Sequence, residues 1–433
     1  MESPYVWLFY FFFREGVLVN KVILKNVRPF IDGAFQTPTT MNLVEGRWVD
    51  ESIEGATEID AKGALALPAL FALGLDFQEP LRDDIYTFQN GYTAMRRGGF
   101  YGGIYESTAN PIDNVQKLSA IQQVFSKSGL HLSILGAFSK HHMCEQLSEM
   151  LELASCGVCG FGDGNHLNAT TRFLRLAMEY GAMTSKRFFF LPLDLSLRCA
   201  GCVHEGDVAD VLGMKGIPRI AETIVVHTIL ETALFLNVPI HLKQITCSES
   251  LNLIEQARAR GLDVTCDVGL YHLLFDDQAI FNLDSHYYII PPLRTPKDKE
   301  ALWDGLKRGV IDAISCNHTP VLRQEKEVNF EDAVAGAISL EVALPAIWST
   351  LVDHVGERRA LDLLSFNPAK IASAMPQKIE KGTIVNLVLL DPKEQSQVTP
   401  EKLAGAVRNT PLLNAQLPSA IKGSYIHGVW TQV

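Results

Sequence analysis

Three side chains that could transfer protons lie in or directly after apolar segments of the sequence. Asp76 lies in LPALFALGLDFQEP, Asp163 in GFGDG and His318 in ISCNHTP. A carboxylate and a histidine can act as general acid and base, and two carboxylates can contribute to a site for a hard cation such as Mg²⁺. Two carboxylates alone are weak evidence for a metal, so hydrogen-bonded or solvated side chains are the default interpretation. We expect a structural role for His318.

Four of the eight cysteines form two CxxC pairs, Cys156/Cys159 and Cys199/Cys202, which could bind zinc. The stretch between the pairs is much longer than the about 15–20 residues of a zinc ribbon. Each pair also lies beside an apolar, strand-like segment. We therefore predict reduced, buried structural cysteines, with a four-thiolate zinc site as the alternative.

The elements that must position these side chains alternate between short apolar runs and amphipathic stretches. Continuous apolar runs are typical of parallel strands covered on both faces. The predicted strands are residues 131–138, 187–194, 238–246, 262–268, 287–292 and 311–315. The predicted helices are residues 221–237, residues 248–261 and a third that begins after Thr295, a predicted N-cap followed by Pro296.

This strand–helix repeat predicts an α/β protein with a (β/α)8 barrel over residues 67–371. A doubly wound open sheet is the alternative, although no GxGxxG motif follows a predicted strand. Both ends of the chain are rich in strand formers and turn signals, so residues 17–66 and 372–433 are predicted to join in one small β domain. The site of such a barrel lies at the carboxyl ends of its strands.

Composition restricts the class of protein further. The 433 residues are 47% hydrophobic and 20% charged, with a net charge of -11 from 38 basic and 49 acidic side chains. This balance does not support nucleic-acid binding, and no apolar run approaches the about 20 residues of a membrane span. Residues 1–16 include YVWLFYFFF but do not fit a signal peptide, so we interpret them as an N-terminal extension. We expect a cytoplasmic protein without a membrane or nucleic-acid partner.

Several short motifs follow one another along the chain. LPALFALGLDFQEP precedes GIPRIAE, VTCDV, PPLRTPKDKEAL, ISCNHTP, SLEVALP and NPAKI. Each motif is weak alone, but their order and separations are specific. From about residue 22 to residue 392 the chain resembles dihydroorotase of the amidohydrolase superfamily. The resemblance implies a barrel that hydrolyses a cyclic amide with bound metal.

The positions implied to bind that metal carry unsuitable residues. The family's metal histidines fall on Gly74, Asp76, Leu191 and Gln244, its catalytic aspartate falls on Asn317, and only Asp163 stands near the place of its carboxylate or carboxylated lysine. Glycine and leucine have no side-chain donor, and glutamine is a poor one. An amide is no base near neutral pH. We predict that the chain binds neither metal nor another cofactor.

The positions implied to bind substrate are changed in parallel. Gln78 replaces the arginine that would pair with a carboxylate, and Thr108 and Ile290 replace two asparagines. Only His318 of this set is retained. The resemblance therefore implies that a dianionic substrate would find no bidentate cation partner.

The remaining polar residues have structural interpretations. His241 lies outside the family's metal set. Arg294, Asp298 and Glu300 are assigned to loop and helix-cap electrostatics, whereas His141 and His142 lie in a polar segment that could be exposed.

The chain is similar to inactive dihydroorotase homologues that are subunits of bacterial aspartate carbamoyltransferase. This similarity implies a non-catalytic subunit that supports assembly of that enzyme in pyrimidine biosynthesis, with the aspartate carbamoyltransferase catalytic chain as partner and with self-association. One alternative is a divergent metal-free enzyme that uses Asp76, Asp163 and His318. Others are a protein that binds a small ligand in the barrel, and a metal-free adaptor of the same superfamily, which matches PPLRT and NPAKI less closely.

Overall fold

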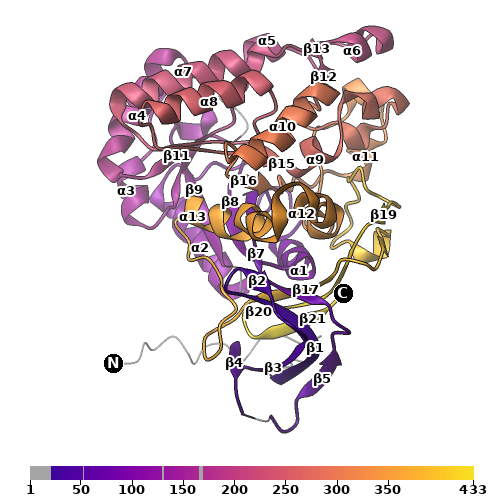
Figure 1. Ribbon diagram of the computed structural model, residues 1–433. Helices are drawn as coiled ribbons and strands as arrows, with labels where there is room; N and C mark the ends of the chain where they lie inside the picture. The colour runs from indigo at the N-terminus through magenta and orange to yellow at the C-terminus, as the bar shows by residue number, and fades with distance from the viewer. Residues whose placement is uncertain (1–20, 52, 129–130, 165–168) are drawn as a thin grey trace.

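Eight parallel strands form the barrel of the computed structural model, which describes residues 21–51, 53–128, 131–164 and 169–433 (Figure 1). In pairing order they are β7 (Leu70–Leu75), β8 (Phe100–Tyr105), β9 (Leu132–Ala137), β10 (Gly160–Gly162), β11 (Arg187–Phe190), β14 (Ile240–Leu242), β15 (Val264–Gly269) and β16 (Ala313–Ser315). An isolated bridge between Leu75 and His318 and a hydrogen bond from the Cys316 N–H to the Leu73 carbonyl (3.1 Å) join the last strand to the first. The predicted (β/α)8 barrel is confirmed.

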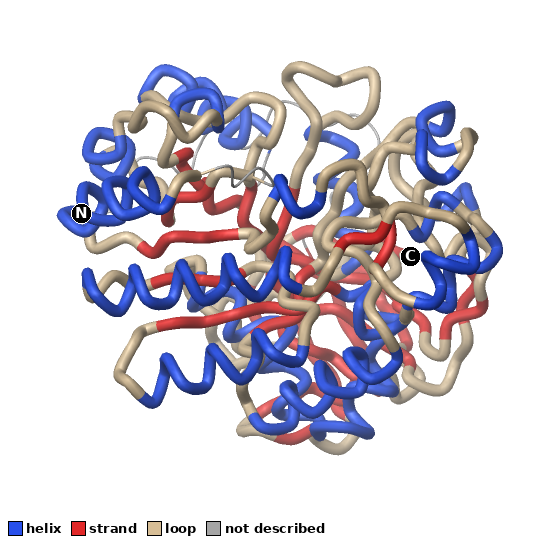
Figure 2. Tube along the Cα trace, turned by 90° about the horizontal axis from the view of Figure 1, so that it is seen from above, coloured by secondary structure: helices blue, strands red, loops and turns tan. Residues whose placement is uncertain are grey.

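Helices surround this barrel, as the view from above shows (Figure 2). The longer ones are α1 (Phe88–Gly98), α2 (Val115–Ser128), α4 (Thr171–Gly181), α7 (Ile220–Leu236), α8 (Ser248–Ala259), α10 (Pro296–Arg308) and α12 (Ala343–Leu361). The three predicted helices correspond to α7, α8 and α10. Thr295 caps α10 as predicted, because its hydroxyl accepts a hydrogen bond from the Asp298 N–H.

The second large sheet combines both ends of the described chain. Its main path runs through β21 (Val429–Gln432), β20 (Ala420–Ile426), β17 (Leu387–Asp391), β6 (Leu65–Pro68), β1 (Lys21–Ile31), β3 (Thr39–Val44) and β4 (Arg47–Val49). β6 and β17 pair antiparallel, with Leu387 opposite Pro68. A β-rich part built from both ends is therefore confirmed (Figure 1), whereas its predicted boundaries stay a prediction. The predicted N-terminal extension, residues 1–16, lies outside the described residues.

One predicted strand is wrong. Residues 287–292 form the end of a short 3-10 helix (Ser285–Tyr287) and a loop with a cis bond between Ile290 and Pro291. The apolar side chains of this run serve packing within a loop, since Tyr288 and Ile289 are buried in hydrophobic clusters. Burial by packing produced the same pattern as a buried strand.

The cysteine prediction is also wrong in part. Cys202 is buried, but Cys156 and Cys199 are exposed, and Cys159 is intermediate. Cys156 and Cys199 each follow the last residue of a short helix, where the chain turns at the surface. Among the described residues, no group of three or more His, Cys, Asp or Glu side chains is placed to hold a metal ion.

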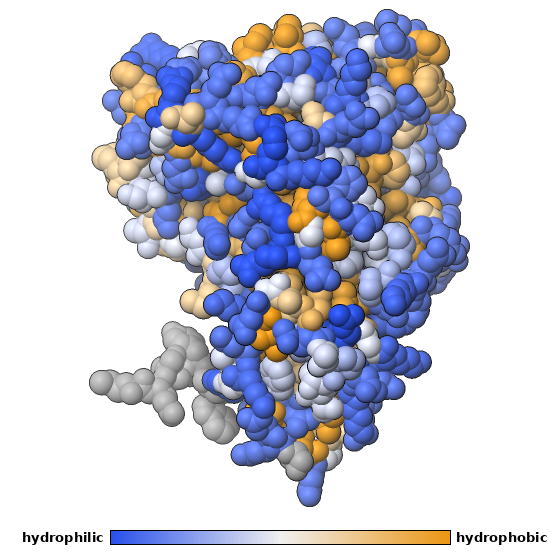
Figure 3. Space-filling view, viewed as in Figure 1, coloured by the Kyte–Doolittle hydropathy of each residue, from blue (hydrophilic) through white to orange (hydrophobic). Residues whose placement is uncertain are grey.

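The outer surface on the face shown in Figure 3 is largely polar, with hydrophobic residues in separate patches. Within the described part of the chain, no helix has both the length and the apolar character needed to cross a bilayer.

Candidate functional site at the mouth of the barrel

An ion pair crosses the mouth of the barrel. Glu106 follows β8 and Lys243 follows β14, and the Lys243 ammonium lies 2.6 Å from Glu106 Oε2. The ammonium also donates to the Gly164 carbonyl (2.8 Å), while Glu106 Oε1 accepts from the Gly164 N–H (2.8 Å). Both charged side chains are nearly buried. This contact links three strand ends, and we did not predict it from the sequence; the only signal was a lysine inside the apolar segment VPIHLKQIT.

Asp76 lies at the end of β7, where two predicted substrate positions contact it. Hydrogen bonds from Thr108 and Gln78 reach its carboxyl. Burial raises the pKa of Asp76 to about 6, and the neighbouring charge of Glu106 adds to this rise. The structure thus brings together Asp76, Gln78 and Thr108, which satisfy one another.

Asp163 follows β10 and serves as an acceptor within the fold. Its Oδ1 accepts from the backbone N–H groups of Phe138 and Ser139 (both 3.1 Å), and its Oδ2 accepts from the Ser139 hydroxyl (2.5 Å) and the Cys144 thiol (3.3 Å). Burial raises the pKa of Asp163 to about 7. The carboxyl group therefore anchors the loop that follows β9, and its oxygen atoms are used within the fold and not for a ligand at the mouth.

His318 is packed behind the mouth. Its side chain is fully buried, its Nδ1 accepts from the Ser339 N–H (3.1 Å), and its ring lies against Phe77 and Tyr86. Burial lowers the pKa of His318 to about 3. These contacts give His318 the structural role expected from the sequence and do not place it with Asp163 in an acid–base pair.

Gly74 and Asn317 are in close contact. Gly74 has φ +76°, and a Cβ atom there would lie 2.4 Å from Asn317 Oδ1 and 3.1 Å from Asn317 Cα. The site therefore requires glycine for both conformation and space. Leu191, after β11, is buried and contributes only apolar surface.

His241 belongs to a buried polar cluster, as its structural interpretation implied. Its Nε2 lies 2.9 Å from Asp267 Oδ2, and its Nδ1 lies 2.8 Å from the Thr265 hydroxyl. Asp267 Oδ1 accepts from the Ser315 hydroxyl (2.5 Å, a short contact) and from the Gln244 N–H (2.9 Å). This cluster fixes the backbone of Gln244.

A small cavity of about 40 Å³ opens beside these strand ends. Gln244, Ile290 and Asn317 line it together with residues that follow β15 and β16. The predicted vestigial positions are therefore divided. Three line the cavity, three satisfy one another around Asp76, and the others are packed into the fold.

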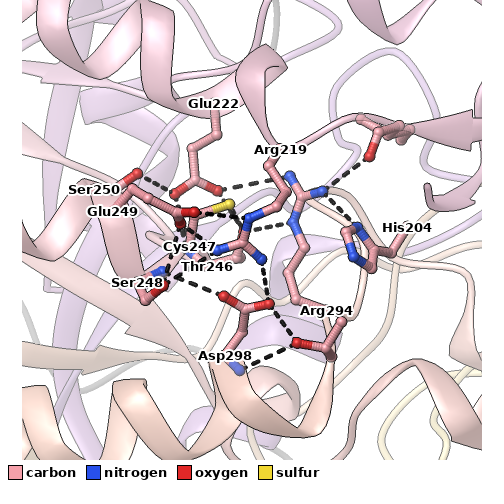
Figure 4. Close-up of polar contacts among 12 residues, drawn as sticks. His204, Arg219, Glu222, Thr246, Cys247, Ser248, Glu249, Ser250, Arg294 and Asp298 are labelled. Atoms are coloured by element: carbon pink, nitrogen blue, oxygen red, sulfur yellow. Dashed lines mark hydrogen bonds and ion pairs between the residues drawn. The ribbon is translucent and has the colours of Figure 1, made fainter. Parts of the chain in front are cut away.

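Arg294 lies in a second buried network, beside the mouth (Figure 4). It donates to the Thr246 hydroxyl (3.1 Å), to His204 Nδ1 (3.0 Å) and to the Ile217 carbonyl (2.9 Å), and its Nη2 is 3.8 Å from Glu222 Oε2. Its side chain is only 1% exposed. The assignment of Arg294 to loop and helix-cap electrostatics is thus wrong, because the residue is a core cation.

The remaining assignments divide in the same way. Asp298 takes part in the α10 cap and also pairs with Arg219 (2.5 Å), whereas Glu300 is exposed. His141 is exposed, but His142 is buried.

Comparison with known proteins identifies the family, although no protein-family model matches the chain. A dihydroorotase of Pelotomaculum thermopropionicum is 31% identical over 363 residues, which cover 82% of this chain and 84% of the relative. This chain belongs to the dihydroorotase family. A dihydroorotase of Carboxydothermus hydrogenoformans is also 31% identical, over 83% of this chain and 84% of the relative. A "dihydroorotase-like protein" of Pseudomonas aeruginosa is 30% identical, over 86% of this chain and 88% of the relative.

Solved structures support the fold of this dihydroorotase-family chain. An L-hydantoinase (dihydropyrimidinase) from Arthrobacter aurescens superposes with a TM-score of 0.79 at 18% identity, over 95% of this chain and 96% of that one. A D-hydantoinase (dihydropyrimidinase) from Thermus sp. superposes with a TM-score of 0.75 at 19% identity, over 95% of this chain and 96% of that one. At this identity the likeness concerns architecture alone.

The residues at this family member's mouth do not fit the metal that the family resemblance implies. Gly74 and Leu191 offer no donor atom, and the Lys243 ammonium places a positive charge among the strand ends. The nearby carboxyls already accept hydrogen bonds from protein groups. We therefore derive no chemical step through a metal.

The ionisation of Asp163 should make the stability of the protein depend on pH. Its pKa of about 7 in the folded state exceeds the ordinary value of 3.8 expected in the unfolded state. Between these values only the folded state keeps the proton, so the free energy of unfolding falls as the pH rises from about 4 to about 7. The slope is at most about 1.4 kcal/mol per pH unit.

Urea unfolding of the wild type and of Asp163→Asn at about pH 5, 6 and 7 measures this effect. The difference in free energy between the two proteins cancels titrating groups that they share. We expect the wild type to lose stability relative to the variant as the pH rises. A difference that stays constant over this range would contradict the assignment.

Proposed function

We propose that this dihydroorotase-family chain is a non-catalytic subunit that supports assembly of aspartate carbamoyltransferase. The observation that carries the non-catalytic part is the nearly buried Lys243–Glu106 ion pair, which places a lysine cation, and no metal ligand, among the strand ends at the mouth of the barrel. The packing of Gly74 against Asn317 supports it as well, because this contact leaves no space for a larger residue at Gly74. The partner is proposed from the similarity of the sequence to inactive homologues that are subunits of that enzyme.

The intact fold supports a scaffold role. The β-rich sheet and the barrel both carry extensive buried apolar clusters. The replaced positions lie at strand ends instead, where Asp76 accepts hydrogen bonds from Thr108 and Gln78 and Gly74 packs against Asn317. A chain of this kind retains its surface for assembly while its site no longer supports hydrolysis.

Restoring two of the histidines should not restore hydrolysis. In the Gly74→His, Asp76→His variant, Leu191, Gln244 and Asn317 are unchanged, so a metal would still lack ligands and a base. The new side chain at Gly74 would also contact Asn317 and adopt a positive φ, which should destabilise the protein by about 1–3 kcal/mol. Dihydroorotate hydrolysis and bound zinc are measured, with Asp76→His as the control that keeps Gly74.

Turnover by the double variant would contradict the non-catalytic interpretation. So would stoichiometric zinc together with dihydroorotate hydrolysis in the wild-type protein. We expect the wild type and both variants to hydrolyse dihydroorotate no faster than buffer.

Co-expression tests the assembly role. The full chain is produced with the aspartate carbamoyltransferase chain of the same organism, and the native mass is measured with and without it. We expect one large complex that requires this chain. An Asn317→Asp variant, changed only at the barrel mouth, should assemble equally well. Two proteins that elute independently would overturn the proposed partner, whatever the result of the hydrolysis assay.

A further inference from the structure

Three segments that follow barrel strands form one lobe on the side of the barrel where the strands end. They are residues 199–217 after β11, residues 275–291 after β15 and residues 321–336 after β16. Their short elements include α6 (Asp207–Leu212), the 3-10 helices η4 (Asp277–Asn282), η5 (Ser285–Tyr287) and η6 (Phe330–Asp332), and α11 (Arg323–Lys326). Because the carboxyl ends of the parallel strands meet at the mouth, the lobe lies beside the mouth (α6 and α11 in Figure 1).

The lobe has a packed interior. A separate hydrophobic cluster contains Ala209 of α6, Ile280 of η4 and Phe330 of η6. The ring of Tyr288 stacks on that of Phe330, with their centroids 5.3 Å apart. The buried Lys326 ammonium donates to the Tyr288 carbonyl oxygen (3.2 Å) and so ties α11 to the middle segment. These contacts join all three segments, so the outer surface of the lobe is held in one arrangement.

All three segments expose large hydrophobic side chains on this outer surface. α6 and η4 pack against each other, so exposed side chains on the two elements are neighbours. Single apolar residues scattered over a surface are normal, but several on one small lobe indicate an interaction surface. The apolar patch of the lobe comprises Val211 on α6 (73% exposed), Phe281 and Leu283 at η4 (49% each), Val328 (45%) and Val334 (46%).

The apolar patch is surrounded by acidic side chains. The three segments contain ten aspartate and glutamate residues but three lysine and arginine residues. Lys326 is buried and Arg323 pairs with Glu327 (2.6 Å), so these cations do little to neutralise the surface. An acidic residue adjoins three members of the patch in the sequence, as Asp210–Val211, Leu283–Asp284 and Glu327–Val328.

Asp277 of η4 experiences this excess of acidic charge. Burial raises the pKa of Asp277 to about 6, and the charges of Asp276, Asp298 and Asp207 add to the rise. Asp207 belongs to α6, so like charges from several elements act on one carboxyl group. A positively charged protein surface would relieve this repulsion, whereas nucleic acid or an anionic lipid surface would increase it. A two-fold contact with a second copy would bring two acidic lobes together.

We propose that the lobe is the surface on which the assembly partner docks, and that the partner meets it with apolar side chains flanked by lysine and arginine. This inference rests on the proposed function, since the partner is the aspartate carbamoyltransferase catalytic chain. The contact would remove the apolar patch from water, and the carboxylates around the patch would pair with the partner's cations.

The affinity of the two purified full-length chains, measured by isothermal titration calorimetry, tests the apolar patch. We expect Phe281→Ser to weaken binding at least tenfold, since exposed aromatic side chains dominate such contacts. Val211→Ser should weaken binding at least threefold, and its exposure makes the fold tolerant of the change. Phe235→Ser is the matched control, because Phe235 of α7 is 74% exposed and lies outside the lobe. Urea midpoints verify that each variant is folded.

The salt dependence of binding tests the charges. An increase from about 50 to about 200 mM salt should weaken wild-type binding, because the salt screens the carboxylates. The Asp207→Asn, Asp210→Asn variant should bind at least threefold more weakly and depend less on salt. Glu58→Gln, on β5 (Thr57–Asp60) and outside the lobe, should match the wild type.

The outcomes separate this inference from the proposed function. If the wild-type chains bind each other and the variants of the lobe bind equally well, the docking surface is wrong while the assembly role stands. If the wild-type chains do not bind, both are overturned. Weaker binding by the lobe variants, with wild-type affinity in Phe235→Ser and Glu58→Gln, supports both.

Discussion

Replacing Lys243 with methionine should destabilise the protein by about 3–5 kcal/mol, because it leaves the Glu106 carboxylate nearly buried without its cation. The ammonium contacts both Glu106 Oε2 (2.6 Å) and the Gly164 carbonyl (2.8 Å), so one substitution also removes a tie between strand ends. Methionine keeps much of the length and apolar surface of lysine. The decrease in the free energy of unfolding should therefore reflect the lost charge and its hydrogen bonds, and not lost packing.

A double-mutant cycle separates the charge effect from packing. In Lys243→Met, Glu106→Gln the remaining side chain is neutral, and its oxygen can still accept from the Gly164 N–H. We expect this variant to be more stable than Lys243→Met alone, with a favourable coupling of at least about 1 kcal/mol. Urea unfolding measures all four proteins.

An exposed ion pair provides the matched control. Lys25 and Glu58 lie 2.6 Å apart, like the buried pair, but their side chains are 46% and 57% exposed. Lys25→Met should cost less than about 1 kcal/mol, since solvent screens the pair. If Lys243→Met were no more harmful than Lys25→Met, the ion pair would not be an important tie between the strand ends at the mouth.

The barrel could be predicted well from the sequence, because a parallel strand that is buried on both faces consists of a continuous apolar run. The apolar runs at 131–138, 187–194, 238–246 and 311–315 contain β9, β11, β14 and β16, and the run at 262–268 covers all of β15 except its last residue. Apolarity does not distinguish a strand from a packed loop, however. Residues 287–292 are similarly apolar, yet they lie largely in a loop with a cis Ile290–Pro291 bond, and Tyr288 and Ile289 of this segment are buried in two hydrophobic clusters.

The contents of the mouth could be predicted only in part. The replacement of the family's ligands is visible residue by residue, as at Gly74 and Leu191. The ion pair that lies in their place could not be predicted from the sequence, because Glu106 and Lys243 are 137 positions apart and neither belongs to a motif. A lysine within an apolar strand segment was the one available signal, since a buried cation requires a partner.

Glu222 posed the same difficulty at the second network. It lies in the first turn of α7 within GIPRIAE, where its type is typical of a helix start. The structure shows a fully buried carboxylate. Its Oε1 accepts from the N–H groups of Thr246 (3.1 Å) and Cys247 (3.0 Å) and from the Ser250 hydroxyl (2.7 Å). The sequence around Glu222 does not indicate these partners, because they lie at the start of α8, 24 to 28 residues along the chain.

Glu222→Gln should destabilise the protein by about 3–5 kcal/mol. The amide can still accept from the start of α8, but it no longer compensates Arg294, whose side chain is 1% exposed (Figure 4). Its NH₂ group also faces the Thr246 hydroxyl, which now donates to the carboxylate. The buried guanidinium would keep only neutral partners, and an uncompensated buried charge is the costly state.

The decisive comparison uses the same exchange on the same helix. Glu231 also pairs with an arginine, Arg260, but at the surface of α7, so Glu231→Gln should leave the urea midpoint essentially unchanged. In Glu222→Gln, Arg294→Met no buried charge is left alone, and this double variant should be more stable than the sum of the two single losses predicts. Strict additivity would show that Glu222 acts through its hydrogen bonds to α8 and not through Arg294. Equal midpoints for Glu222→Gln and Glu231→Gln would show that burial of the carboxylate carries no energetic weight, which contradicts the network as the structure presents it.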